Sequence, residues 1–204
     1  MRKLLISIMF LFGGALTMVS AQDMRTVFLN APDGIFPLLS GNDRADLVDY
    51  IEAGMTAKVT NRLDGTTVLH ELENDYLRLA TTASSDVQLK LLPFQGDTVI
   101  CMIKTVKAEA ADSRIRFYDK EWNLLDGDRM FRFPSIAEFF TSAVNELVNK
   151  CDIYLVSLTL SATDNTLAAE YTMPAYMSED DAKKVKPMLR KLVYRWNGSC
   201  YVIE

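Results

Sequence analysis

The stretch that decides the fold is residues 66–106, TTVLHELENDYLRLATTASSDVQLKLLPFQGDTVICMIKTV. Apolar and polar residues alternate along most of it, which is the period-two pattern of β-strands. Pairs of turn-forming residues interrupt the alternation at Asn74-Asp75, Ser84-Ser85 and Gln95-Gly96. Because short strands joined by such turns pair with their neighbours in the sequence, the stretch predicts an antiparallel meander.

The same pattern extends the meander in both directions. Asp64-Gly65 adds a turn before it. The predicted strands are 58–63, 66–73, 76–82, 86–93, 98–106 and 113–119. Residues 99–103 are apolar at every position, so we expect both faces of that strand to be covered.

Helices are expected on either side of the meander. Asn42 or Asp43 is suited to cap a short helix that Gly54 ends. Its apolar face is predicted to hold Leu47, Val48, Ile51 and Met55. Ser135 and Glu138 form a capping-box pattern that opens the clearest helix of the chain. Its apolar positions are Ile136, Phe139, Phe140, Ala143, Val144, Leu147 and Val148.

The C-terminal part adds two pairs of strands with a helical segment between them. The predicted strands are 153–161 and 166–173, joined at Asp164-Asn165, and 193–196 and 200–203, joined at Asn197-Gly198. The helical segment begins at Ser178, and Pro187 predicts a kink or a break into two short helices.

This order of elements lacks a βαβ rhythm and predicts an α+β fold, with helices packed on antiparallel meander sheets. Two tandem helix-plus-sheet units are expected, over residues 22–127 and 128–204, with Asp126-Gly127-Asp128 as a polar joint. One continuous domain is the alternative.

Residues 1–21 have the order of a secretory signal peptide: Arg2 and Lys3, an apolar run, then small residues up to Ala21. Cleavage after Ala21 predicts an exported mature chain, periplasmic or extracellular, with no stable membrane span; an uncleaved anchor is the alternative. The mature chain would hold 20 Lys and Arg against 27 Asp and Glu, a net charge of −7. Nucleic acid is therefore not an expected partner.

The sequence offers no constellation that we assign to catalysis, a cofactor or a metal. His70 is the only imidazole, lies in a predicted strand and is interpreted as structural. It would share a strand face with Val68 and Leu72, opposite Leu69 and Glu71. The three cysteines have no CxxC spacing: if any pair bonds we favour Cys151 with Cys200, and three buried thiols including Cys101 are the alternative.

Charged and aromatic clusters have structural interpretations. The acidic groups Asp43, Asp46, Asp49 and Glu179, Asp180, Asp181 fit helix surfaces and helix starts. The basic residues Lys183, Lys184, Lys186, Arg190 and Lys191 follow the second acidic group, which suits a helix dipole. The aromatic residues Tyr76, Tyr118, Trp122, Tyr171, Tyr176, Trp196 and Tyr201 are expected mostly in the core, with an exposed binding face as the alternative.

Several motifs carry a resemblance to a known family. They are Leu38-Leu39, Asn42-Asp43-Arg44, Asp46-Leu47-Val48-Asp49-Tyr50, Asp75-Tyr76-Leu77 and the run from Asp112 to Asp119 with Trp122. With these the chain resembles an exported Bacteroidales family known only as a domain of unknown function. The resemblance implies compartment and lineage, and no site residue. The predicted topology is also similar, more weakly, to envelope modules of the β-lactamase-inhibitor-protein and PepSY-like type.

We therefore expect an exported, non-enzymatic binding or protein-interaction module of the bacterial envelope, with an envelope protein or an unknown ligand as partner. The alternatives are a hydrolase that uses carboxylates in a cleft between two units, and a structural envelope component. Two close, buried carboxylates in a pocket would favour the hydrolase.

Overall fold

The structure is a computed structural model that describes residues 23–141 and 151–204. The predicted signal peptide and its cleavage site lie outside the described residues, as do positions 142–150 of the predicted helix that starts at Ser135. Among the residues that are described, no helix is long and apolar enough to cross a membrane.

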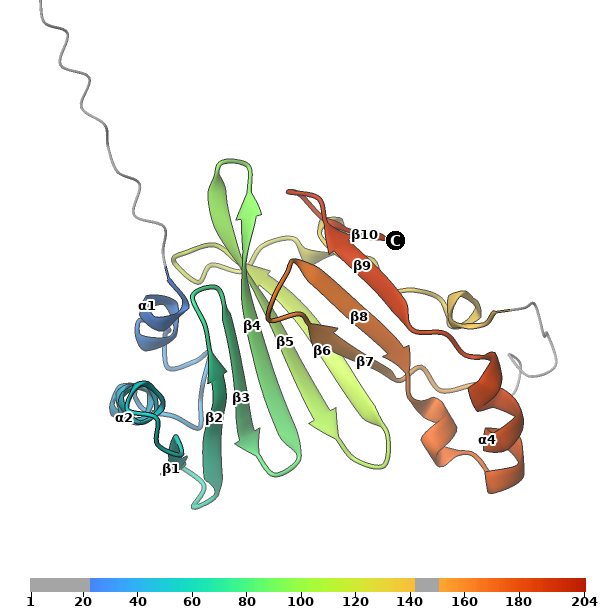
Figure 1. The fold of residues 1–204 in the computed structure, drawn as a ribbon, viewed down its shortest axis with the longest axis horizontal. Coiled ribbons are helices and arrows are strands. Elements are labelled where there is room, and N and C mark those ends of the chain that lie inside the picture. The colour runs from blue at the N-terminus through green and yellow to red at the C-terminus, as the bar shows by residue number, and fades with distance from the viewer. Residues whose placement is uncertain (1–22, 142–150) are drawn as a thin grey trace, which may run out of the picture.

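Two antiparallel sheets form the molecule (Figure 1). The six-stranded N-terminal sheet has the order β1 (Lys58–Thr60), β2 (Thr66–Leu72), β3 (Tyr76–Thr82), β4 (Ser85–Phe94), β5 (Asp97–Lys107) and β6 (Ala111–Tyr118). The four-stranded C-terminal sheet has the order β10 (Tyr201–Ile203), β9 (Leu192–Trp196), β8 (Thr166–Tyr171) and β7 (Val156–Leu160). Every strand pairs with its neighbour in the sequence within its sheet, which confirms the predicted α+β fold with antiparallel meanders.

The predicted turns explain why the strands end where they do. Asp64, Gln95, Gly96 and Gly198 adopt positive φ values of 58°, 50°, 85° and 97°, the conformation that tight turns between strands require. One strand departs from the prediction at His70, where the register between β2 and β3 shifts. This β-bulge places Leu69 and Leu72 against the same hydrophobic cluster, so the expected alternation across His70 is wrong.

In the described residues, the N-terminal sheet is preceded by α1 (Met24–Leu29), which was not predicted, and by α2 (Gly41–Glu52). The cap of α2 is Ser40 and not Asn42 or Asp43, because Ser40 Oγ accepts from the Asp43 backbone N–H while the Asp43 carboxylate accepts from Ser40 N–H. Gly54, with φ 69°, follows the helix as predicted. Met55 is 54% exposed and does not join the buried face.

The helix predicted from Ser135 is interrupted at Phe140. The described part is a single 3₁₀ turn, η2 (Ile136–Phe139), and Phe140 has an extended backbone that bridges to Leu189. Arg190 N–H also donates to Phe139 O at 2.8 Å. Thr141 N–H donates to Met188 O at 2.9 Å, so backbone bonds with residues 188–190 replace helical bonds at Phe139 and Thr141, which contradicts the predicted continuous helix.

The other helical elements of residues 23–141 and 151–204 are short. They are η1 (Gly127–Arg129), η3 (Met173–Tyr176), α4 (Glu179–Val185) and η4 (Lys186–Met188). Ser178 caps α4, and the helix gives way to η4 at Pro187, which confirms the predicted break.

Both faces of the N-terminal sheet carry buried side chains. On one face, α1, α2 and the segment between them enclose a cluster that includes Phe28, Leu47 and Leu89. On the other face, residues such as Val99 and Ile103 share a cluster with the C-terminal sheet. Since Ile100 and Met102 belong to the first cluster and Val99, Cys101 and Ile103 to the second, the prediction that β5 is covered on both sides is confirmed.

Polar side chains join the two sheets. Strand β7 lies against β4, β5 and β6 and presents its backbone edge to them. Gln88 Oε1 accepts from Leu160 N–H at 2.9 Å, and Ser113 Oγ accepts from Leu158 N–H at 3.0 Å. Side chains of the first sheet thus satisfy backbone groups that a strand edge otherwise leaves open.

Candidate interaction surface

We call α1, α2 and the segment between them the helical layer, and the sheet face that they cover the outer face. This layer does not cover the whole outer face of the N-terminal sheet. Val87 and Leu89 on β4 are buried beneath it, at 3% and 0% exposure, whereas Val106 on the same face of β5 is 58% exposed. Beyond this boundary lies a hollow of about 260 Å³, which we call the cationic hollow. Its lining residues are Met102, Lys104, Val106, Asp112, Arg114 and Arg116.

The register of β5 and β6 brings these side chains together. Met102 pairs with Arg116, Lys104 with Arg114, and Val106 with Asp112. Residues opposite each other in an antiparallel pair point to the same face of a sheet, and so do residues two apart on one strand. The hollow therefore holds three cations and one carboxylate, although the chain as a whole is acidic.

The two arginines of the hollow have no ion-pair partner in the part of the chain that the structure describes. Among the described residues, Arg114 and Arg116 make no ion pair and no side-chain hydrogen bond. Lys104 Nζ donates to Ile35 O at 3.1 Å, and Asp112 Oδ1 accepts from Val156 N–H at 3.4 Å. The lysine and the carboxylate thus have internal partners, whereas both guanidinium groups are exposed and open to a ligand.

Electrostatics within the cationic hollow are repulsive. Burial lowers the pKa of Lys104, and the nearby Arg116 lowers it further. Cations placed together in this way gain free energy when an anion enters between them.

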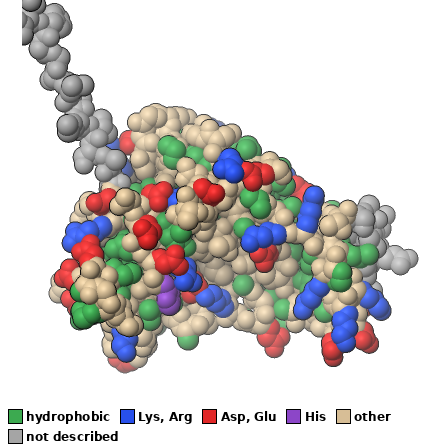
Figure 2. All heavy atoms as spheres, in the orientation of Figure 1, with side chains coloured by type: hydrophobic (Ala, Val, Ile, Leu, Met, Phe, Trp, Pro, Cys, Tyr) green, Lys and Arg blue, Asp and Glu red, His purple; other side chains and the backbone are tan. Residues whose placement is uncertain are grey.

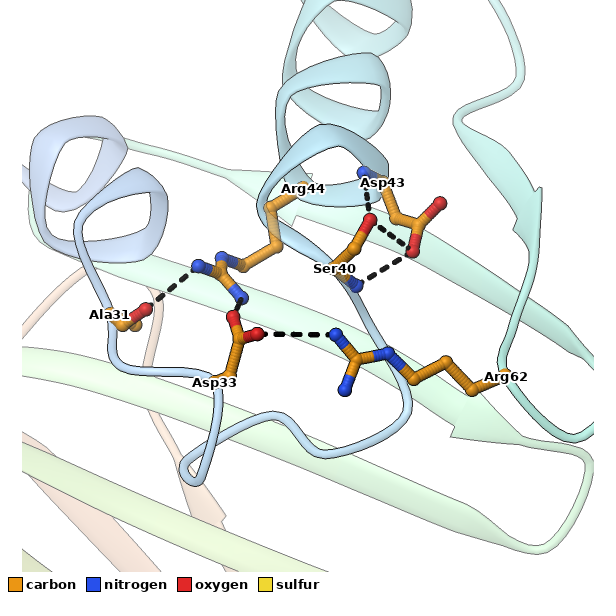
Figure 3. Close-up of polar contacts among 6 residues, drawn as sticks. All are labelled: Ala31, Asp33, Ser40, Asp43, Arg44 and Arg62. Atoms are coloured by element: carbon orange, nitrogen blue, oxygen red, sulfur yellow. Dashed lines mark hydrogen bonds and ion pairs between the residues drawn. The ribbon is translucent and has the colours of Figure 1, made fainter.

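The most elaborate polar cluster elsewhere has a structural role (Figure 3). Arg44, which is 4% exposed, donates to Ala31 O at 2.7 Å and to Asp33 Oδ1 at 3.4 Å. Arg62 donates to the other oxygen of Asp33 at 3.1 Å. These contacts attach the segment between α1 and α2 to the start of α2. Both arginines already have Asp33 as their counter-ion.

The three aspartates beside a second hollow have partners. A hollow of about 470 Å³ is lined partly by Asp23, Asp75 and Asp97. The hydrogen bond from Thr26 lowers the pKa of Asp23, the one from Thr98 N–H lowers that of Asp97, and Asp75 pairs with Lys90. A general acid needs a raised pKa, so this arrangement offers no acid and base pair.

The other sequence-predicted residues are dispersed. His70 is exposed at the bulge, and within the described chain no three His, Cys, Asp or Glu residues form a group able to hold a metal. Asp43 serves the cap of α2, and Asp181 N–H is bonded to the cap of α4. No disulfide joins the cysteines: Cys101 and Cys151 are buried and Cys200 is half-buried.

The predicted aromatic and basic groups do not form a site. Of the seven named aromatic residues, all are buried except Tyr176, which is 48% exposed. The basic cluster lies on and after α4, where Lys183 pairs with Glu179. On the face shown in Figure 2, acidic and basic side chains are interspersed and hydrophobic ones are scattered between them.

Sequence reasoning missed the cationic hollow. Its one local signal is the alternation of Arg114 and Arg116 with Ser113, Ile115 and Phe117, which places both arginines on one strand face. The contribution of Lys104 depends on the register between β5 and β6, which no motif specifies.

Comparisons with known proteins give a family and a fold. Residues 16–201 match the family described as "Protein of unknown function (DUF3256)". The chain is also similar to a solved domain of an uncharacterised protein from Porphyromonas gingivalis W83, with 27% sequence identity, a TM-score of 0.77, and coverage of 90% of this chain and 98% of that one. No curated protein matches.

Proposed function

The chain belongs to the DUF3256 family, and we propose that it is a non-enzymatic binding module of the bacterial envelope that docks a partner protein through the cationic hollow. The observation that carries the proposal is the pair of exposed guanidinium groups, Arg114 and Arg116, which no described residue neutralises. Arginine is enriched at protein-binding surfaces, and here the two arginines stand beside an exposed apolar residue, Val106.

The carboxylates support this function over a hydrolase. Of the carboxylates that line the hollow of about 470 Å³, Asp23 caps α1, Asp75 pairs with Lys90 and Asp97 pairs with Lys120, and the pKa shifts of Asp23 and Asp97 are downward. The cationic hollow itself contains one carboxylate, Asp112, whose Oδ1 accepts from the backbone of β7.

The proposed compartment follows from the signal-like N-terminus. We propose cleavage after Ala21 and an envelope protein as the partner. An acidic mature chain with a local basic site disfavours nucleic acid, because long polyanions bind best to proteins with extended basic surfaces.

The experiment is in-cell cross-linking in the native host, followed by mass spectrometry. Three tagged forms are compared: wild type, the double variant R114Q/R116Q, and the matched control K184Q/K186Q. The control removes the same charge from exposed positions of α4 and η4. We expect one envelope protein to be recovered with wild type and control and lost with R114Q/R116Q.

Two results would overturn the function. Recovery of the same partner by all three forms would remove the cationic hollow from the interaction. Recovery of nothing above a control secreted protein would remove the protein partner itself.

A further inference from the structure

Resting on the proposed function, we propose that the cationic hollow recognises an extended, acidic segment of the partner protein whose carboxylates stand at alternate residues. Arg114 and Arg116 would each take one carboxylate. Lys104 would add positive charge beside Arg114, its cross-strand neighbour.

The spacing of the arginines carries this inference. Residues two apart on a strand are separated by roughly 7 Å, since each residue advances about 3.3 Å. The carboxylates of an extended segment with the pattern acidic–any–acidic repeat at the same distance on one face. A helical segment lacks this match, because its neighbouring side chains on one face are three or four residues apart.

The chemistry of the side chains points the same way. A guanidinium group has a planar set of donors that fits a carboxylate with two hydrogen bonds, and neither arginine has a described partner that would compete. Lys104 is held by Ile35 O and lies at the border of the helical layer, so its charge is fixed in place.

The rim of the hollow favours a peptide over a simple anion. Val106 is 58% exposed next to the cations, and its cross-strand neighbour is Asp112. An exposed valine makes no favourable contact with a phosphate or a sulfate, but it can cover an apolar side chain two residues beyond the acidic pair, on the same face of the segment. Asp112 would repel a further acidic residue at that end, which limits the acidic run.

The test uses the full chain purified from its host and three synthetic peptides of identical length. One carries glutamates at alternate positions, the second has the same composition with glutamates three apart, and the third has glutamine in place of glutamate. We expect the alternate peptide to bind about tenfold more tightly than its isomer, with the glutamine peptide weaker still. Affinity should fall as salt is added.

Variants connect the preference to the two arginines. R114Q and R116Q should each lose about tenfold in affinity for the alternate peptide and lose the discrimination between isomers, whereas K184Q/K186Q should match wild type. Because Arg114 and Arg116 are exposed and form no described side-chain hydrogen bond, thermal unfolding of the variants should match wild type, which separates lost binding from lost folding.

Other results would overturn the inference. Equal affinity for both isomers would show that the net charge of the peptide, and not the spacing of its carboxylates, determines binding. Binding of polyphosphate in preference to every peptide would replace the peptide by a phosphate polymer. If no peptide binds while R114Q/R116Q still loses the cross-linked envelope partner, the inference fails and the proposed function stands; if peptides discriminate but no partner is cross-linked, the proposed function fails.

Discussion

Lys90 Nζ lies 2.9 Å from Asp75 Oδ2, although the lysine side chain is 1% exposed and the aspartate side chain is 47% exposed. The same ammonium group donates to Ala162 O at 3.3 Å, just beyond β7. A half-exposed turn of the first sheet therefore neutralises a buried charge that also contacts the second sheet.

Removing the Asp75 carboxylate should destabilise the fold more than removing the Lys90 ammonium group. Asp75→Asn leaves a buried ammonium without its counter-ion, and we expect the free energy of unfolding to fall by about 1 to 3 kcal/mol. Lys90→Met removes the charge and keeps an apolar stem, so its loss should be smaller. Urea denaturation followed by tryptophan fluorescence measures both; a D75N protein as stable as wild type would contradict this account.

Arg44 should not tolerate lysine. A single ammonium cannot reach both Ala31 O and Asp33 in the buried geometry of the guanidinium, so Arg44→Lys should lower the free energy of unfolding by about 1 to 3 kcal/mol. The matched control is Arg62→Lys, which alters the exposed contact to the same aspartate and should cost less than about 1 kcal/mol. Similar losses in both variants would contradict a special role for the buried arginine.

Glu138 gives a pH dependence with a defined sign. The hydrogen bond from Arg132, with further bonds from Ser135, lowers the pKa of Glu138 to about 2, against an ordinary 4.5. Because the folded-state pKa is below the unfolded-state value, the carboxylate stabilises the fold above about pH 4.5 and loses this effect as pH falls towards 2.

The variant Glu138→Gln isolates this charge. It should be less stable than wild type at pH 7 by about 1 kcal/mol, and the difference should shrink as pH is lowered through that window. Urea denaturation at a series of pH values measures the difference. If the difference in unfolding free energy between variant and wild type stays constant down to about pH 2.5, the effect is due to packing and not to the charge.

The thiols should differ in reactivity. Burial raises the pKa of Cys101, which is 0% exposed, whereas Cys200 is half-buried with its Sγ 3.6 Å from Asn197 Nδ2. Iodoacetamide should therefore alkylate Cys200 first and reach Cys101 only on unfolding. Mass spectrometry of peptides over time checks this, with Cys200→Ser as the control that should lack the fast modification. Equal rates at both positions would contradict it.

The strands could be predicted from sequence because their signals are local. Each turn pair, such as Asn74-Asp75 or Gln95-Gly96, ends one alternating run and starts the next, and the strands β2 to β6 begin and end within two residues of prediction. The prediction of a continuous helix from Ser135 was wrong for the opposite reason. Its capping box forms, but Phe140 pairs with Leu189, and no local pattern reports a contact with a residue so far along the chain.

The candidate site was less predictable than the fold. Arg114 and Arg116 are visible as an alternation, but their exposure depends on where the helical layer stops, between Val87 and Val106 on paired strands. That boundary is a property of packing and not of composition. The likeness of the chain to a family could be inferred from its motifs, and the family match confirms it.

The contacts of Gln88 and Ser113 with β7 have a consequence for self-association. An open strand edge is a template on which a second chain can add a strand and begin a fibril. Here Ser113 and Gln88, which belong to the same chain, accept hydrogen bonds from the N–H groups of Leu158 and Leu160. These groups are therefore not available to a second molecule. The chain is thereby protected against the addition of a second strand at these two positions of β7.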